Sequence, residues 1–89
     1  KKGRETLFKT IAVSDMTSVF YESVHRIEKT LESLTKSLDE TRQIVIAREL
    51  TKMHEEVIRG TSEEIKKYFE ANKDHVRGEF VVIVEKANS

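Results

Sequence analysis

The sequence predicts a single α/β domain, with a mostly parallel or mixed sheet of about 4–5 strands and helices packed on its faces. Three runs of consecutive apolar and β-branched residues, at 17–21, 43–47 and 80–84, are typical of strands that are covered on both faces. The segments between them carry apolar side chains at helical spacing, as amphipathic helices do. The 89 residues are enough for one such core.

The first predicted element is a short amphipathic helix over residues 5–13. Leu7, Phe8 and Ile11 recur there at helical spacing, after a basic and polar start. The run 17–21 follows closely and contains the β-branched and aromatic residues that favour a strand. We expect this strand to be the first of the sheet.

The clearest helix is predicted over residues 24–38. Ile27, Leu31 and Leu34 share one face of it, and charged residues occupy the other face. Ser23 is the expected N-cap, since a serine oxygen can accept a hydrogen bond from an unpaired amide of the first turn. This helix is expected to bury its apolar face against the sheet.

A βαβ unit is predicted from residue 17 to residue 47. Strand, helix and strand in this order form a right-handed crossover that leaves the two strands parallel. Residues 48–60 contain one apolar pair, Val57 and Ile58, and are expected to form a loop with at most one short edge strand.

A third helix is predicted to begin after Thr61. Thr61 and Glu64 match a capping box, in which the threonine oxygen and the glutamate carboxylate each accept a hydrogen bond from a backbone amide. This helix is expected to end near Glu70, and Gly78 then precedes the last strand, 80–84. The side chains expected to share one core are Ile27, Leu31, Leu34, Val45 and Val82.

Composition excludes several classes of protein. The sequence has no cysteine, so it forms neither a disulfide nor a thiolate zinc site, and a reducing cytoplasmic setting is expected. No stretch is long and apolar enough for a membrane helix, so no membrane partner is expected. The 16 Lys and Arg residues balance the 16 Asp and Glu residues, so net charge gives no argument for nucleic acid. His54 and Glu55 lack a second histidine at ligand spacing, and no metal site is predicted.

Charged residues follow directly after the first two predicted strands, within 21–26 and 47–52. Ligands of open α/β sheets bind at the carboxyl ends of strands, so these residues are candidates for a functional site. The alternative is a structural role, in which the same charges form ion pairs between neighbouring loops, such as Glu22 with Arg48. The spacing of the residues leaves both interpretations open.

Four motifs in this order resemble one known family. They are KKGR at the start, then VFYESVHRIEKTLESL, VIARELTKMHEEVIRGT and GEFVVIVE, and together they cover nearly the whole chain. The set is similar to the ribosomal RNA small-subunit methyltransferase I group of the tetrapyrrole-methylase-like methyltransferases. One departure is Val24, which stands where that group usually has a proline after Tyr-Glu-Ser. Valine lacks the fixed φ of proline, so the turn is expected to be slightly looser.

The resemblance implies two α/β domains with S-adenosyl-L-methionine in the cleft between them. It implies transfer of a methyl group to the ribose 2′-hydroxyl of a cytidine in small-subunit ribosomal RNA. Residues 5–89 then correspond to the carboxyl-terminal domain, and residues 1–4 to the remnant of a linker from a missing amino-terminal domain. The expected partners are that domain, the ribosomal RNA and a second copy of the chain, and the isolated domain is expected to be inactive.

The resemblance also suggests roles for individual residues. The residues expected at the cofactor are Tyr21, Glu22, Ser23, Leu50, Gly78, Glu79 and Phe80. The residues expected at RNA phosphates or riboses are His25, Arg26, Arg48, Lys52 and Arg59. For these cations, ion pairs with Glu22, Glu49, Glu55 and Glu56 remain an equal alternative. Glu22 and Glu49 are the candidates for a catalytic base.

Two other functions remain open. A small α/β unit of this kind can serve as a non-enzymatic RNA-binding or interaction module. A related methylase acting on a small tetrapyrrole is the other alternative, although the motif set resembles the ribosomal RNA group in particular. A cofactor-binding domain encoded directly before Lys1 would exclude the interaction module.

Overall fold

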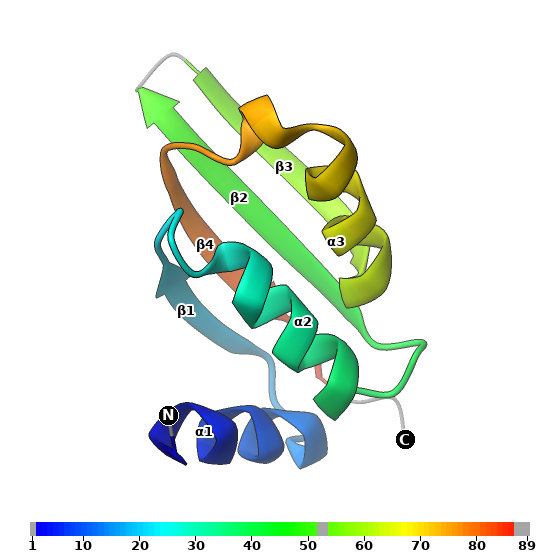
Figure 1. The fold of residues 1–89 in the computed structure, drawn as a ribbon. Coiled ribbons are helices and arrows are strands. Elements are labelled where there is room, and N and C mark those ends of the chain that lie inside the picture. Colours follow the sequence, from blue (N-terminus) through cyan, green and yellow to red (C-terminus); the bar gives the residue numbers. More distant parts are fainter. Residues whose placement is uncertain (1, 52–53, 87–89) are drawn as a thin grey trace.

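The computed structural model describes the backbone of residues 2–51 and 54–86, and the side chains of 6–48 and 55–86. Figure 1 shows helices packed on a single sheet. The elements in chain order are α1 (Lys2–Val13), β1 (Ser18–Glu22), α2 (Ile27–Ser37), β2 (Gln43–Thr51), β3 (His54–Thr61), α3 (Ser62–Ala71), the short 3-10 helix η1 (Lys73–His75) and β4 (Glu79–Val84).

The sheet has four strands in the order β1-β4-β2-β3, and all three pairings are antiparallel. The prediction of a mostly parallel or mixed sheet is therefore wrong. β1 and β2 do run in the same direction, because both are antiparallel to β4, but β4 lies between them. Apolar runs mark where strands are, whereas their order depends on contacts between distant segments. Here the crossover through α2 leaves room for one strand, which β4 fills.

Residues 48–60, predicted as a loop with at most one short edge strand, are largely β-strand, and the edge strand is longer than predicted. β2 continues to Thr51, and β3 pairs with it as an antiparallel hairpin over eight residues. Hydrophobic periodicity is weak in this strand, because Val57 and Ile58 are its only apolar pair. The strand is held instead by backbone pairing and by the polar contacts of Glu56 and Arg59, which local hydrophobic patterns do not reveal.

The boundaries of α2 and α3 test two predicted caps. α2 begins at Ile27, and its N-cap residue is Arg26, without a side-chain cap, so Ser23 is not the N-cap. The amides of Arg26 and Ile27 instead donate to the Ser23 carbonyl, which forms a turn ahead of the helix. The capping box of α3 is confirmed: Thr61 Oγ1 accepts from the Glu64 amide at 3.2 Å, and Glu64 Oε1 accepts from the Thr61 amide at 2.9 Å.

One core fills the space between the helices and one face of the sheet. Ile27, Leu31, Leu34 and Val82 belong to it and are fully buried, as predicted. Val45 is buried but lies on the opposite face of β2, because it alternates with Ile44 and Ile46, so its assignment to this core was wrong. The remaining members come from every layer: Phe8, Ile11, Leu38, Ile44, Ile46, Ile65, Phe69, Phe80 and Val84.

The second face of the sheet is uncovered in the part of the chain that is described. α2 and α3 both lie on the first face (Figure 1), so the prediction of helices on both faces is wrong. The uncovered face is apolar nevertheless, and Val19, Tyr21 and Val57 are 61%, 79% and 68% exposed on it. This explains why the strand sequences are typical of strands covered on both faces. No helix in the described ranges is long and apolar enough to cross a membrane.

Arg42 anchors α1 to the sheet. Its guanidinium is buried and donates to the carbonyls of Ile11 and Ala12, at 2.9 Å and 3.0 Å, and to the carbonyl of Glu85 after β4. The carbonyls at a helix C-terminus have no partners within the helix, and a cation there is also favoured by the helix dipole. Arg42 therefore joins the first helix to the two central strands.

Candidate functional site

A hollow of about 400 Å³ lies where β1 ends and β4 begins. The two strands are paired so that Glu22 is opposite Phe80, and the segments beyond this pair form the walls. The residues that line the hollow are Tyr21, Glu22, Ser23, Val24, His25, Gly78 and Glu79. Five of the seven residues expected at the cofactor lie in this set, namely Tyr21, Glu22, Ser23, Gly78 and Glu79.

The β4 wall of the hollow depends on Gly78. Its φ of 85° lies in the left-handed region that side chains disfavour, so glycine allows the chain to turn sharply into β4. Glu79 follows with an exposed side chain. Phe80, the third residue expected here, points the other way: it is fully buried and packs edge-on against Phe69, with ring centroids 5.6 Å apart. Phe80 can therefore support the wall but does not line it.

The β1 wall carries one buried carboxylate. Glu22 is 7% exposed, accepts a hydrogen bond from the Ser23 amide at 3.1 Å and accepts another from the hydroxyl of Thr30 in α2. These bonds fix the carboxylate at the beginning of the helix. Tyr21 and Ser23 on either side of it are exposed. The wall thus combines one fixed acidic group with two accessible hydroxyls.

Exposed cations stand beside the hollow. His25 lines it and Arg26 follows, and both side chains are exposed. Arg77 is also exposed and directly precedes Gly78 in the other wall. Arg77 was not among the predicted site residues, because it lies in a polar connection without periodicity. Its position next to the only glycine of that connection was the available signal.

The other expected contacts with RNA or cofactor lie away from the hollow or outside the described residues. Arg59 is on the uncovered face of β3, where it forms an ion pair with Glu85. The side chains of Glu49 and Leu50 lie outside the described ones, although both residues belong to β2. Lys52 lies wholly outside the described residues.

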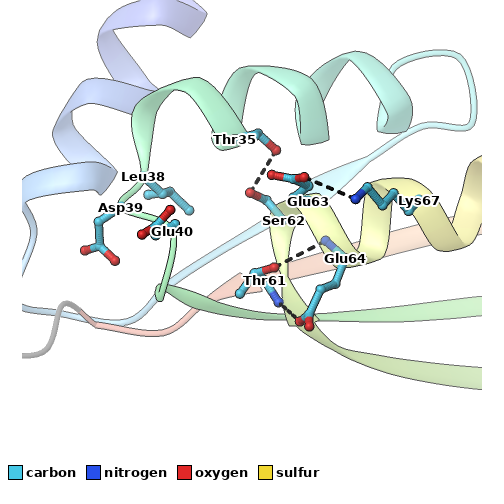
Figure 2. Close-up of a pocket in the computed structure, with 9 residues that line it drawn as sticks. All are labelled: Thr35, Leu38, Asp39, Glu40, Thr61, Ser62, Glu63, Glu64 and Lys67. Atoms are coloured by element: carbon cyan, nitrogen blue, oxygen red, sulfur yellow. Dashed lines mark hydrogen bonds and ion pairs between the residues drawn. The ribbon is translucent and has the colours of Figure 1, made fainter.

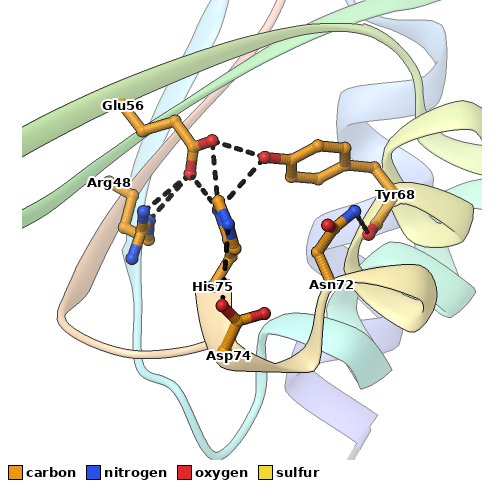
Figure 3. A network of polar contacts seen from close by, with 6 residues as sticks. All are labelled: Arg48, Glu56, Tyr68, Asn72, Asp74 and His75. Carbon is orange, nitrogen blue, oxygen red and sulfur yellow. Dashed lines mark hydrogen bonds and ion pairs between the residues drawn. The ribbon is translucent and has the colours of Figure 1, made fainter.

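Arg48 belongs to a partly buried network on the helix-covered face (Figure 3). It is 8% exposed, and its Nη2 and Nε lie 2.8 Å and 3.0 Å from Glu56 Oε1. Tyr68 of α3 donates its hydroxyl to Glu56 Oε2 at 2.5 Å. His75 Nδ1 lies 3.1 Å from both Glu56 Oε1 and the Tyr68 hydroxyl oxygen. The ion-pair alternative considered for Arg48 thus describes its contacts in this structure.

The network shifts the ionisation of two of its members. Burial alone would raise the pKa of Glu56, but hydrogen bonds from Tyr68, His75 and Arg48, together with the charge of Arg48, outweigh it and hold this pKa below its usual 4.5. The hydrogen bond to Glu56, followed by burial, raises the pKa of Tyr68 above its usual 10.0. Glu56 is therefore an anionic acceptor and Tyr68 a neutral donor at neutral pH.

A larger hollow of about 780 Å³ lies at the junction of α2 and α3 (Figure 2). Its polar groups already serve the helix ends: Thr35 Oγ1 donates to Ser62 Oγ at 2.9 Å, beside the capping box of α3. Hydrogen bonds from the hydroxyl and amide of Thr41 hold the pKa of Asp39 below its usual 3.8. The lining is rich in carboxylates, which disfavours a phosphate or RNA ligand. Its residues are Thr35, Leu38, Asp39, Glu40, Thr61, Ser62, Glu63, Glu64 and Lys67.

Among the described residues, no group of three or more histidine, cysteine, aspartate or glutamate side chains is placed to bind a metal ion. His75 contacts Glu56 and Tyr68 as a hydrogen-bonding partner. The chemistry available at the first hollow is therefore that of hydroxyls, carboxylates, cations and backbone groups.

Known proteins resemble this chain in sequence and in fold. The family model of the tetrapyrrole (corrin/porphyrin) methylases matches residues 1–66. Two relatives named ribosomal RNA small subunit methyltransferase I, from Bacillus subtilis and Haemophilus influenzae, are 39% and 40% identical over 100% and 94% of this chain. The chain spans about 30% of the length of each.

A solved structure shares the fold. It is that of a cobalt precorrin-4 methyltransferase, a cobalamin biosynthetic enzyme, with a TM-score of 0.65 over 88% of this chain and 32% of that one. The sequence identity is 15%, so this likeness concerns the fold alone.

Proposed function

Because this chain belongs to the tetrapyrrole (corrin/porphyrin) methylase family, we propose that it is the carboxyl-terminal domain of an S-adenosyl-L-methionine-dependent methyltransferase that modifies small-subunit ribosomal RNA. The relatives that share 39% and 40% of its residues carry the name ribosomal RNA small subunit methyltransferase I. The observation that carries the proposal is the hollow between β1 and β4, which gathers five of the residues that the family resemblance assigns to the cofactor.

The hollow has features that suit S-adenosyl-L-methionine. The glycine at 78 lets the backbone turn at the rim without a side chain, so a ligand can approach the peptide groups there closely. Tyr21 and Ser23 offer hydroxyls that can donate or accept, and Glu79 offers a carboxylate for a ribose or an amino group. When bound, the cofactor supplies an electrophilic methyl group. The residues of this chain hold it and orient it.

Removal of the ribose proton requires a modest base and good positioning. Glu22 is within the hollow, but its carboxylate accepts bonds from Ser23 and Thr30, which suits a fixed acceptor that organises the turn. Glu49 continues β2 at the same end of the sheet, opposite Glu79. We retain both as candidates for the base, beside any group that another domain contributes.

The exposed cations at the rim are proposed to face RNA. His25 and Arg26 follow β1, and Arg77 precedes β4, so three cationic or ionisable groups flank one opening. Cations of this kind position a phosphate backbone without reading its sequence. The target in this proposal is a cytidine 2′-hydroxyl, and the cytoplasm is the place of action.

The hollow is proposed to be one wall of a cleft whose other wall comes from the rest of the polypeptide. Tyr21 and Glu79 line the hollow, and both also alternate onto the uncovered face of the sheet. A domain that packs on this apolar face at Tyr21 and Glu79 would therefore also lie next to the hollow. The chain spans about 30% of the length of its relatives, and an amino-terminal domain is the proposed cover. A homodimer is a further proposal, which light scattering of the complete protein would test.

Methyl transfer to isolated small ribosomal subunits tests the proposed function. The complete protein should transfer labelled methyl groups from S-adenosyl-L-methionine to subunits from a strain that lacks the modification. A 2′-O-methyl group blocks attack on the adjacent phosphate, so the label should appear in an alkali-resistant dinucleotide. Label in a mononucleotide, or on a tetrapyrrole but not on RNA, would contradict the proposal.

A further inference from the structure

We propose that Glu56 is a positioning residue for the cofactor hollow, although it lies outside it. Glu56 fixes the connection 72–78, the end of which forms the Gly78 wall. The inference rests on the proposed function, because it assigns the network in Figure 3 to the same binding site. It adds to that proposal a residue that is not part of the lining of the hollow.

Glu56 joins three other elements through one carboxylate. Arg48 reaches it from β2, Tyr68 from α3 and His75 from η1, at 2.8 Å, 2.5 Å and 3.1 Å. An ionised carboxylate only accepts hydrogen bonds, so His75 binds it when Nδ1 carries the proton. The side chains of Glu56, Arg48 and His75 are 23%, 9% and 32% exposed, so these bonds are partly shielded from solvent.

Besides His75, the connection 72–78 is restrained by Val76, which packs partly buried against the core, and by a few polar contacts. Its backbone hydrogen bonds are local turns, among them His75 amide to Asn72 carbonyl at 2.8 Å, and sheet pairing begins only at Glu79. Besides His75, one charged contact to a distant element is described here, between Lys73 and Glu28 of α2, at 2.5 Å. That pair is 66% and 38% exposed, and exposed ion pairs contribute little. The contact with Glu56 is therefore the firmer of the two polar anchors of this connection.

The anchor lies close to the binding wall along the chain. His75 is separated from Gly78 by only Val76 and Arg77, and the left-handed φ of Gly78 sets the direction in which the wall enters β4. A change in the position of η1 should alter this wall, because only Val76 and Arg77 lie between His75 and Gly78 and neither belongs to a paired strand. Loss of the carboxylate charge should therefore displace the peptide groups that face the cofactor.

The experiment measures binding of S-adenosylhomocysteine, the demethylated product, to the complete protein by calorimetry. Glu56→Gln keeps the shape of the side chain, and Tyr68→Phe removes one donor with little loss of packing. Each variant should raise the dissociation constant, by about tenfold for Glu56→Gln and less for Tyr68→Phe. The matched control is Glu63→Gln, which breaks an exposed 3.3 Å pair with Lys67 at the other hollow and should leave affinity unchanged.

A second readout without ligand is hydrogen exchange of the amides in 76–79, which should be faster in Glu56→Gln than in the wild-type protein or Glu63→Gln. Unchanged affinity and unchanged exchange in a folded Glu56→Gln variant would overturn the inference. A lower melting temperature with unchanged affinity would also overturn it, since it would show a merely structural role. If the wild-type protein binds no S-adenosylhomocysteine, the proposed function fails, and the exchange experiment still decides whether Glu56 holds the connection.

Discussion

Arg48 and Glu56 are paired across β2 and β3, and their side chains form a partly buried ion pair on the helix-covered face of the sheet. The pair ties the edge strand to a central strand at the end where the candidate site lies. Because Tyr68 and His75 converge on the same carboxylate, the ion pair also connects the hairpin to α3 and to η1. This arrangement makes the stability of the domain sensitive to the charge of one residue.

Acid should weaken the domain through Glu56. Its pKa is lowered on folding, so its contribution is complete above the unfolded value of about 4.5 and is lost as the pH falls through the lower folded value. The pKa of Tyr68 is raised, so its contribution is present below about 10.0 and is lost as the pH rises through the higher folded value. Urea denaturation at a series of pH values measures the free energy of unfolding. This free energy should be constant between the two limits and should decrease below the lower one and above the higher one.

The Glu56→Gln variant tests whether Glu56 causes the loss of stability at low pH. It cannot titrate, so its unfolding free energy should fall less steeply below pH 4.5 than that of the wild-type protein. Glu63→Gln, which alters an exposed pair, should retain the wild-type slope. If the unfolding free energies of the wild-type protein and Glu56→Gln fall equally with pH in this range, Glu56 is not the group that causes the loss of stability in acid.

Replacement of Arg42 should detach α1. Arg42→Ala leaves the Ile11 and Ala12 carbonyls without their donor, and we expect the unfolding free energy to fall by about 2–4 kcal/mol. Circular dichroism should show a loss of helix at temperatures where the rest remains folded. Arg77→Ala removes an exposed arginine and should change stability by less than about 0.5 kcal/mol. Equal stability of the two variants would contradict the anchoring role of Arg42.

The two faces of the sheet should respond differently to truncation. Leu31→Ala empties a fully buried position of α2 and should lower the unfolding free energy by about 2–5 kcal/mol. Val19→Ala on the uncovered face, where the side chain is 61% exposed, should cost less than about 0.5 kcal/mol in the isolated domain. Denaturant titration of both variants makes the comparison. A large effect of Val19→Ala in the isolated domain would mean that this face is already covered.

Patterns that act within a few residues were sufficient to predict much of the fold. The capping box of Thr61 and Glu64 marked the start of α3, and the spacing of Ile27, Leu31 and Leu34 placed them on the buried face of α2. Both signals are local, because the cap and the stripe depend on helix geometry alone.

Features that depend on distant contacts were not predictable in this way. The insertion of β4 between β1 and β2 is decided by which strands pair, and nothing in a single run specifies its neighbour. The full length of β3 was not predicted, because Arg48 and Glu56 stabilise the strand through a polar pair across the hairpin. The role of Arg48 also depends on a distant contact, so the sequence left RNA binding and an ion pair as equal alternatives. The burial of Arg48 beside Glu56 is an observation that only the structure provides.

Arg26 should contribute to RNA binding without affecting the cofactor. Arg26→Ala in the complete protein should weaken binding to ribosomal RNA and reduce the slope of log affinity against log salt by about one unit, because one phosphate contact is removed. The same outcome is proposed for Lys52, which follows Thr51 in the sequence and lies outside the described residues. Lys67→Ala, at the carboxylate-rich hollow, is the control. An unchanged affinity and slope for Arg26→Ala would assign this cation to the structure of the turn.

Calorimetry with S-adenosyl-L-methionine tests the central claim most directly, that these 89 residues form one wall of a cofactor cleft. The complete protein should bind the cofactor with a dissociation constant in the micromolar range, whereas the isolated chain should remain folded and give no measurable heat of binding. Tyr21→Ala in the complete protein should weaken binding, since Tyr21 lies both in the hollow and on the uncovered face. Micromolar binding by the isolated chain, or wild-type affinity in Tyr21→Ala, would contradict the cleft.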